Sequence, residues 1–303
     1  MSGEPAPIFA RDYQVSAVQA RYGYYASVLR PGMSAAQIRT AINSIQSKPG
    51  FVASLSQSEI TQFINNFEIV ASSSQHLQAA ATGLDALVLR STTTQNLLVA
   101  FGGVGPFENF STTFGEGKDL ILDTSRYGFP VKELLAFKTF FDPLLIQYPQ
   151  DVIDIVGHSK GGLLSSALYG DLLISGAAAR VNLVFQLSPV GFNTAFFDNP
   201  LAAELNVAIG AANPEYLAYA RSILGALKSD DASNIVSFGA ENDPLAGPGS
   251  LTSVSSSTTY FGYYRELLND GARSVPHNAN TVERLFGRCI GERTSINGNP
   301  ISR

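Results

Sequence analysis

Residues Gly157 to Gly161 read Gly-His-Ser-Lys-Gly, a G-x-S-x-G pattern centred on Ser159. The pattern is short enough to arise by chance, so its neighbours decide what it means. The apolar run VIDIV precedes it and the helical run GGLLSSALYGDLL follows it. A strand, a sharp turn and a helix lift a serine Oγ clear of a sheet and point the helix N-terminus at a substrate oxygen. The pattern therefore predicts Ser159 as the nucleophile of an acyl-transfer reaction.

A nucleophilic serine needs a base, and the chain has only three histidines, His76, His158 and His277. Enzymes with this turn have their triad in the order serine, acid, histidine. Only His277 follows Ser159, in a polar turn typical of a loop-borne base. His158 is inside the turn and cannot fold back onto the serine, and His76 is expected as a surface or capping residue. We predict His277 as the base; the alternative is a solvated loop histidine.

The acid of such a triad is expected at the end of a strand. The predicted strand NIVSFG runs into Ala240-Glu241-Asn242-Asp243-Pro244, and Asp243 is the preferred candidate. Glu241 is its competitor, and Asp270 and Asp198 are more distant alternatives. An Asp-Pro turn is also common as a purely structural feature. The prediction is that the Asp243 carboxylate orients His277 and stabilises its imidazolium form.

The oxyanion of an acyl-transfer intermediate needs backbone donors. One is expected from the Lys160 N–H, directly after the nucleophile, and the other from the loop Gly102-Gly103-Val104-Gly105 after the run QNLLVAF. Glycines let backbone approach substrate closely, although the same loop also fits a merely flexible strand exit. The two segments are predicted to lie side by side.

The elements around these residues alternate between strand and helix. The runs LDALVLRS and QNLLVAF predict a hairpin, and DVIDIVG, VNLVFQLS and NIVSFG predict continuous apolar strands separated by helices. Such strands imply an α/β fold with a mostly parallel central sheet and helices on both faces. Residues 1–80 are predicted as a helical N-terminal extension, with a capping box at Ser56 and Glu59. Residues 196–233 are either sheet-covering helices or a helical cap beside the site.

Composition limits the function classes. The 303 residues carry 45% apolar and 15% charged residues and a net charge of −5, which is typical of one globular domain spanning residues 1–303. Basic residues are scattered, so a nucleic-acid partner is not expected, and no apolar run reaches the length of a membrane span. The single cysteine, Cys289, excludes an intrachain disulfide. The start lacks a secretory signal, so we expect a cytoplasmic protein or one exported without a signal peptide.

Four segments together resemble the class-three, fungal-lipase-like lipases of the α/β-hydrolase superfamily. They are LLVAFGGVGPFENF, YPQDVIDIVGHSKGG, LSPVGFNTAFFD and NIVSFGAENDPLAGPG, in the family's order, within about residues 83–277. The resemblance implies an α/β-hydrolase fold, a Ser159-Asp243-His277 triad and no metal or organic cofactor. It also implies an ester or lipid substrate, with transient contact with a lipid surface. It places Val104 at the oxyanion position, or Gly103 if the alignment shifts by one.

The sequence departs from this family at the oxyanion loop and in the turn. Val104 replaces a hydroxyl residue, so only a backbone N–H can serve there, and Lys160 replaces the usual leucine. The Lys160 charge is expected near the pocket mouth, where it could favour acidic substrates; a merely solvated lysine is the preferred interpretation. The motifs favour a serine carboxylic ester hydrolase. An acyltransferase with the same triad and a catalytically silent binding protein remain the alternatives.

Overall fold

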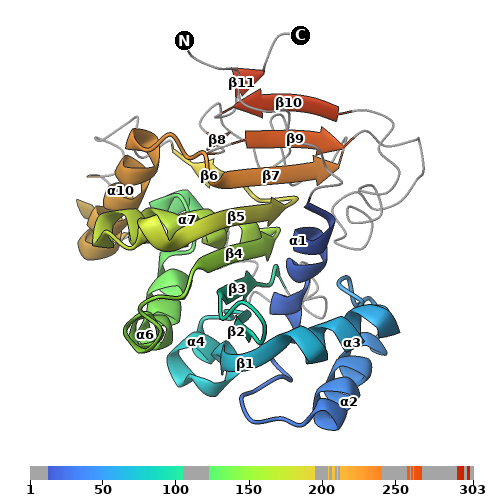
Figure 1. Cartoon of the computed structure of the whole chain (residues 1–303). Helices are drawn as coiled ribbons and strands as arrows, with labels where there is room; N and C mark the ends of the chain where they lie inside the picture. The colour runs from blue at the N-terminus through green and yellow to red at the C-terminus, as the bar shows by residue number, and fades with distance from the viewer. Residues whose placement is uncertain are drawn as a thin grey trace.

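The computed structural model describes residues 13–104, 123–194, 204, 207–208, 210, 212–240, 258–259, 261, 263–267, 292–296 and 299–300. Their centre is a nine-stranded sheet in the order β1-β2-β3-β4-β5-β7-β9-β10-β11 (Figure 1). The strands are β1 (Phe67–Ser72), β2 (Ala86–Ser91), β3 (Leu97–Phe101), β4 (Ile153–His158), β5 (Val181–Leu187), β7 (Ile235–Ala240), β9 (Tyr263–Leu267), β10 (Glu292–Ile296) and β11 (Asn299–Pro300). A separate two-stranded ribbon pairs β6 (Phe192–Asn193) with β8 (Thr258–Thr259).

The middle of the sheet is parallel. The neighbours β3, β4, β5, β7 and β9 all run in one direction, while β1 and β2 on one side and β10 and β11 on the other pair antiparallel. Every residue of β3 is buried. Strands buried on both faces read as unbroken apolar runs, which is why the sequence reveals them. The predicted mostly parallel sheet and the hairpin of β2 and β3 are confirmed.

One face of the sheet is covered by α4 (Leu77–Ala81), α6 (Val131–Gln147), α7 (Lys160–Ser175) and α10 (Pro214–Ser229) (Figure 1). α7 is apolar nearly all round and is buried along most of its length, as a central helix must be. α10 packs closely on it, since a Cβ on Gly170 would lie 2.8 Å from the Ile223 side chain. Within residues 196–233, α10 is thus a helix that covers the sheet. The possible cap stays a prediction, because most of residues 196–211 lie outside the described ranges.

The other face is covered by α1 (Gln14–Gln19), the short 3-10 helix η2 (Tyr22–Tyr25), α2 (Ala35–Gln46) and α3 (Gln57–Asn66) (Figure 1). Both long helices begin with a capping box at Ser34 and Ser56. In each box the serine hydroxyl accepts from the backbone N–H three residues on, and the serine backbone N–H donates to the side chain of that same residue. The predicted box of Ser56 and Glu59 is confirmed. Glu59 also pairs with the buried Arg21 at 2.6 Å, which ties α3 to the segment before η2.

The prediction that residues 1–80 are helical is wrong at one point. α3 ends at Asn66, and Phe67 to Ser72 form β1, which pairs antiparallel with β2 through contacts such as Ile69 opposite Leu89. The run Phe-Glu-Ile-Val is rich in aromatic and β-branched residues, which fit a pleated strand better than a helix. The apparent helical spacing from Ile60 onward therefore continues past the real end of the helix. The short 3-10 helix η3 (Ser73–Gln75) then leads into α4.

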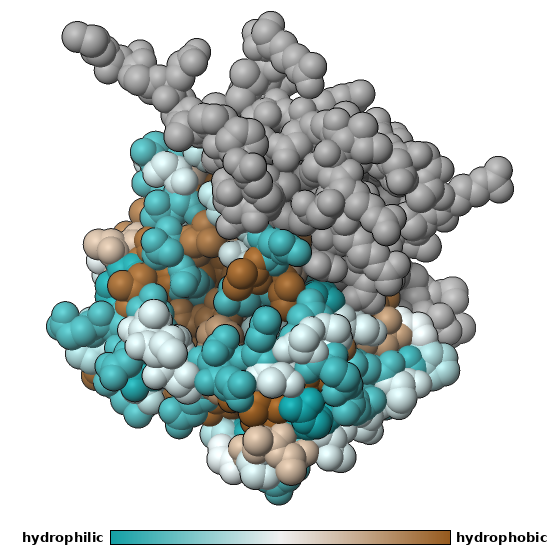
Figure 2. All heavy atoms as spheres, turned by 45° about the vertical axis from the view of Figure 1, so that its right-hand side comes forward, coloured by the Kyte–Doolittle hydropathy of each residue, from teal (hydrophilic) through white to brown (hydrophobic). Residues whose placement is uncertain are grey.

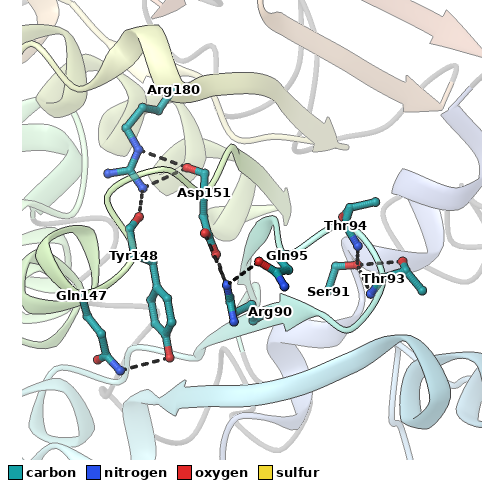
Figure 3. Close-up of polar contacts among 9 residues, drawn as sticks. All are labelled: Arg90, Ser91, Thr93, Thr94, Gln95, Gln147, Tyr148, Asp151 and Arg180. Carbon is teal, nitrogen blue, oxygen red and sulfur yellow. Dashed lines mark hydrogen bonds and ion pairs between the residues drawn. The ribbon is translucent and has the colours of Figure 1, made fainter.

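A polar cluster, drawn in Figure 3, fixes the starts of β4 and β5. The G-x-S-x-G turn follows the other end of β4. Arg180 closes the short 3-10 helix η4 (Ala178–Arg180) before β5 and donates to the Asp151 carbonyl and to Leu145 and Tyr148 carbonyls at the end of α6. The Asp151 carboxylate in turn lies 2.7 Å from Arg90 Nε at the end of β2. Charged donors satisfy carbonyls that the helix end leaves without partners.

On the face that Figure 2 shows, the surface formed by the described residues is mainly polar. Figure 2 shows teal and white side chains over most of that part of the visible face, with apolar residues gathered between them. None of the helices in the described part of the chain combines the length and the apolar character that crossing a membrane requires.

Candidate active site

Ser159 occupies a strained turn between the end of β4 and the start of α7. Its backbone has φ 56° and ψ −121°, a conformation that side-chain-bearing residues rarely adopt and that costs on the order of 1–3 kcal/mol. The surrounding backbone holds it there. Its N–H donates to the Leu187 carbonyl at 3.0 Å, and its carbonyl accepts from the Gly162 and Val190 N–H groups at 3.0 and 3.2 Å. This is the geometry expected of a nucleophile elbow.

Two glycines let the strand, the turn and the helix approach one another. A Cβ on Gly157 would lie 2.2 Å from the Gly161 carbonyl oxygen, and a Cβ on Gly161 would lie 2.3 Å from the Phe101 carbonyl oxygen. No larger residue fits at either position without backbone movement. The first turn of α7 is thereby held against the end of β3, where the glycine loop begins.

The glycine loop lies directly beside the serine. Gly102 is anchored by its N–H to the Asp85 carbonyl at 2.8 Å, and a Cβ on Gly103 would be 3.0 Å from the Ser159 Cβ. Gly103 is buried and Val104 is half-buried. The structure thus brings together the two segments expected to donate to an oxyanion, the Gly103-Val104 loop and the N-terminus of α7. Helix geometry leaves the first backbone N–H groups of α7, Lys160 included, without acceptors inside the helix.

Gly103 also contacts a residue that sequence reasoning missed. Its backbone N–H donates to the Tyr24 hydroxyl oxygen, and a Cβ on Gly103 would lie only 2.2 Å from that oxygen. Tyr24 belongs to η2, far from the turn in sequence. The one available signal was the aromatic run Tyr22-Gly-Tyr-Tyr, which is typical of core packing as well.

The chain leaves β5 and β7 at the carboxyl ends of the parallel strands, the same side of the sheet as Ser159. Leu187 of β5 pairs with His158 on one side and with Phe238 of β7 on the other, so the chain leaves β7 at the edge where Ser159 lies. The predicted acid Asp243 follows three residues after the end of β7. The base and every candidate acid lie outside the described residues and stay predictions: Asp198, Glu241, Asp243, Asp270 and His277.

The two histidines that the structure describes, His158 and His76, each pack against an aromatic side chain. His158 is 2% exposed and its Nδ1 lies 2.6 Å from the Tyr24 hydroxyl. His76 stacks on Phe140 with ring centroids 4.3 Å apart, at the N-terminus of α4, and makes no capping hydrogen bond. Partial burial lowers the pKa of His76, which favours its neutral form. Each ring therefore already has a packing role.

The expectation of a solvated Lys160 is wrong. The side chain is fully buried, and its Nζ lies 2.9 Å from Glu133 Oε2 and donates to the Gly83 carbonyl at 3.0 Å. Glu133 is in the first turn of α6, which lies alongside the first turn of α7. An ammonium can be buried this way because a carboxylate and a carbonyl replace its water. The charge faces the core between the helices, so it plays no part in selecting acidic substrates.

Breaking this pair on one side is expected to destabilise the fold strongly. Lys160→Met and Glu133→Gln should each lower the free energy of unfolding by about 3–5 kcal/mol, because each leaves a buried polar partner uncompensated. The joint change Lys160→Leu with Glu133→Leu should recover most of that loss. Urea unfolding measures all three, with Arg30→Met, at an exposed position, as the control expected within about 0.5 kcal/mol of the parent. A Lys160→Met midpoint equal to that of the parent would refute the buried pair.

The described residues contain no group of three histidine, cysteine, aspartate or glutamate side chains placed to hold a metal ion.

Comparison with known proteins gives no match in sequence: no protein-family model and no curated protein matches this chain. Solved structures do match. A fungal lipase aligns over 95% of this chain and 86% of its own with a TM-score of 0.50 at 13% identity. A lipase of Yarrowia lipolytica aligns over 84% and 78% with a TM-score of 0.46 at 14% identity. A lipase of Rhizopus microsporus aligns over 93% and 88% with a TM-score of 0.45 at 12% identity. The first likeness and the strand order together show that the chain has a fungal-lipase-like α/β-hydrolase fold.

Proposed function

We propose that this protein is a serine carboxylic ester hydrolase in which Ser159 is the nucleophile, His277 the general base and Asp243 the acid. The observation that carries the proposal is the elbow itself. Ser159 has a positive φ between a parallel strand and a buried helix, and the glycine loop is so close that a Cβ on Gly103 would lie 3.0 Å from the Ser159 Cβ. Strain of this kind persists where function requires it, and here it places the serine at the sheet edge that α/β-hydrolases use.

The first half-reaction forms an acyl-enzyme. A serine hydroxyl is a weak nucleophile because it stays protonated at neutral pH. His277 therefore takes the Ser159 proton as Oγ attacks the carbonyl carbon. The carbonyl oxygen gains the negative charge of the tetrahedral intermediate. As the intermediate collapses, the bond to the leaving alcohol breaks and His277 returns the proton to that alcohol. Asp243 keeps the imidazole in the correct tautomer and stabilises its charged form.

The second half-reaction releases the acid. Water takes the place of the alcohol, gives a proton to His277 and attacks the acyl carbon, and the Ser159 Oγ leaves with that proton. In both halves the oxyanion is stabilised by the backbone N–H groups of Lys160 and of the Gly103-Val104 loop. Fixed donors aimed at a developing charge are worth about 3–4 kcal/mol each in enzymes of this type. No step needs a metal or an organic cofactor.

The substrate class follows from this chemistry and from the fold. A neutral acyl ester has the carbonyl that Ser159 attacks, and esters of small alcohols and of lipids share it. Lipases of this fold act on lipid esters, which supports a lipid or lipid-like ester as the substrate here. The buried Lys160 charge gives no reason to expect an acidic substrate.

Turnover of chromogenic esters tests the proposal. The purified chain should hydrolyse p-nitrophenyl butyrate or p-nitrophenyl palmitate with release of the free acid, at a rate unchanged by EDTA. Adding butanol distinguishes a transferase, because a transferase would convert the acyl group almost entirely to the butyl ester. Absence of turnover of both esters, with and without butanol, would contradict the proposal and favour a binding protein.

A further inference from the structure

Tyr24 connects the N-terminal segment to both halves of the candidate site. Its hydroxyl lies 2.6 Å from Nδ1 of His158, the residue before the nucleophile. The same oxygen accepts from the Gly103 backbone N–H, and the tyrosine and histidine rings lie 5.8 Å apart. A phenol has one donor and can accept as well, so one hydroxyl can serve the glycine loop and the elbow together.

Burial keeps this hydroxyl protonated. Tyr24 is 3% exposed, and desolvation raises its pKa above the ordinary value for tyrosine, which outweighs the opposing effect of the Gly103 N–H. The protonated hydroxyl can donate to His158 Nδ1 in the tautomer that carries the His158 proton on Nε2. In that tautomer, a chain of hydrogen bonds runs from the Gly103 N–H through the Tyr24 hydroxyl to His158.

The segment that carries Tyr24 is itself rigid. A Cβ on Gly23 would lie 2.1 Å from the Gly102 nitrogen and 2.3 Å from the Phe101 carbonyl carbon, so η2 lies against the backbone at the end of β3. The hydroxyl of the next residue, Tyr25, lies 2.7 Å from the Ala53 carbonyl oxygen and 2.6 Å from Gln46 Oε1, and its one proton can be donated to either acceptor. Contacts with Gln46 and Ala53 therefore also hold η2 in place, in addition to its packing against β3. A group on such a support can hold a loop in one position.

We propose that Tyr24 is a positioning residue for the oxyanion site and that it commits the Gly103 N–H, so that the donors to substrate are the N–H groups of Val104 and Lys160. This inference rests on the proposed ester hydrolysis. A glycine loop without an acceptor for Gly103 could rotate its peptide planes, and the Val104 N–H would lose its direction. Tyr24 holds the Gly102–Gly103 peptide, which adjoins the Gly103–Val104 peptide that carries the Val104 N–H, and it holds the elbow histidine as well. The N-terminal segment is therefore part of the catalytic unit.

The first test compares two tyrosines of the same turn. Tyr24→Phe keeps the ring and removes the hydroxyl, and it should lower kcat for p-nitrophenyl butyrate about 10- to 100-fold while KM stays within about twofold. Tyr25→Phe is the matched control, since it also removes buried hydrogen bonds of η2 but none to the site. It should lower thermal stability by a similar amount and leave kcat within about twofold of the parent.

The second test uses the close contact between Tyr24 and Gly103. Gly103→Ala alone should abolish most activity, because the new Cβ would lie 2.2 Å from the Tyr24 oxygen. Adding Tyr24→Phe removes that oxygen, so the double variant should be more active and melt at a higher temperature than Gly103→Ala alone. Two changes that each damage the site would then partly compensate, which independent sites do not do.

The outcomes separate this inference from the proposed function. An active parent with Tyr24→Phe behaving like Tyr25→Phe, or with effects of Tyr24→Phe and Gly103→Ala that simply add, would overturn the positioning role alone. A parent without any ester turnover would overturn the proposed hydrolysis and with it the role of Tyr24. A fall in kcat confined to Tyr24→Phe, together with recovery in the double variant, is the result we expect.

Discussion

Replacing Ser159 with alanine is expected to lower kcat/KM for ester hydrolysis by about a million-fold. The Oγ is the only atom that forms the covalent bond to the acyl group, so no partial function remains for the other triad members, and their losses do not add to this one. The fold should tolerate the change, because the contacts that hold the turn are made by the Ser159 backbone. Steady-state turnover of p-nitrophenyl butyrate measures the loss.

The matched control is Ser165→Ala, six residues further along the chain and within α7. Ser165 is fully buried, and its hydroxyl donates to the Gly161 carbonyl at 2.8 Å, within the helix. Its loss removes a serine hydroxyl from the same helix without touching the reacting atoms, so turnover should stay within about threefold. Retention of more than one hundredth of the parent rate by Ser159→Ala would mean that another group is the nucleophile.

Replacing Asp243 with asparagine is expected to lower kcat by about ten thousand-fold. The carboxylate holds the proton of His277 on the nitrogen that faces away from the serine, and an amide in its place favours the wrong tautomer. Asp243 follows the end of β7, the strand whose exit the structure places at the edge where Ser159 lies. Burst and steady-state kinetics of Asp243→Asn should show slower formation of the acyl-enzyme.

Glu241→Gln and Asp198→Asn provide the comparison for this acid assignment. Each also replaces a carboxylate with its amide, and each should leave kcat within a few-fold of the parent. If Glu241→Gln instead causes the ten thousand-fold loss and Asp243→Asn does not, the acid is Glu241 and the reading of the Asp-Pro turn as structural is correct. The nucleophile assignment would be unaffected, because either carboxylate would serve the same His277.

Local features could be read from the sequence. The elbow at Ser159 is encoded by consecutive residues, with an apolar strand before it, glycines on both sides and an apolar helix after it. The capping box of Ser56 and Glu59 is likewise complete within four residues. In each case the residues that create the structure are neighbours in the chain, so their pattern predicts it directly.

Contacts between distant segments could not be read in the same way. Tyr24 and His158 are 134 positions apart, and Lys160 meets the carboxylate of Glu133 only because α6 lies beside α7. The sequence analysis predicts a solvated Lys160 because lysines are rarely buried without a partner, and the sequence does not reveal that Glu133 is the partner. β1 was missed because Phe67 to Ala71 continued the apolar spacing of α3, and only pairing with β2 shows it to be a strand.

Covalent labelling is the most direct measurement of the central claim that Ser159 is an activated nucleophile. A fluorophosphonate probe reacts with a serine Oγ only when a base activates it and an oxyanion site stabilises the product. Incubation of the full chain with the probe, followed by proteolysis and mass spectrometry, should place one adduct on the peptide containing Ser159. The adduct should be absent in Ser159→Ala and present in Ser165→Ala. An unlabelled parent chain, or an adduct on any other residue, would contradict the account.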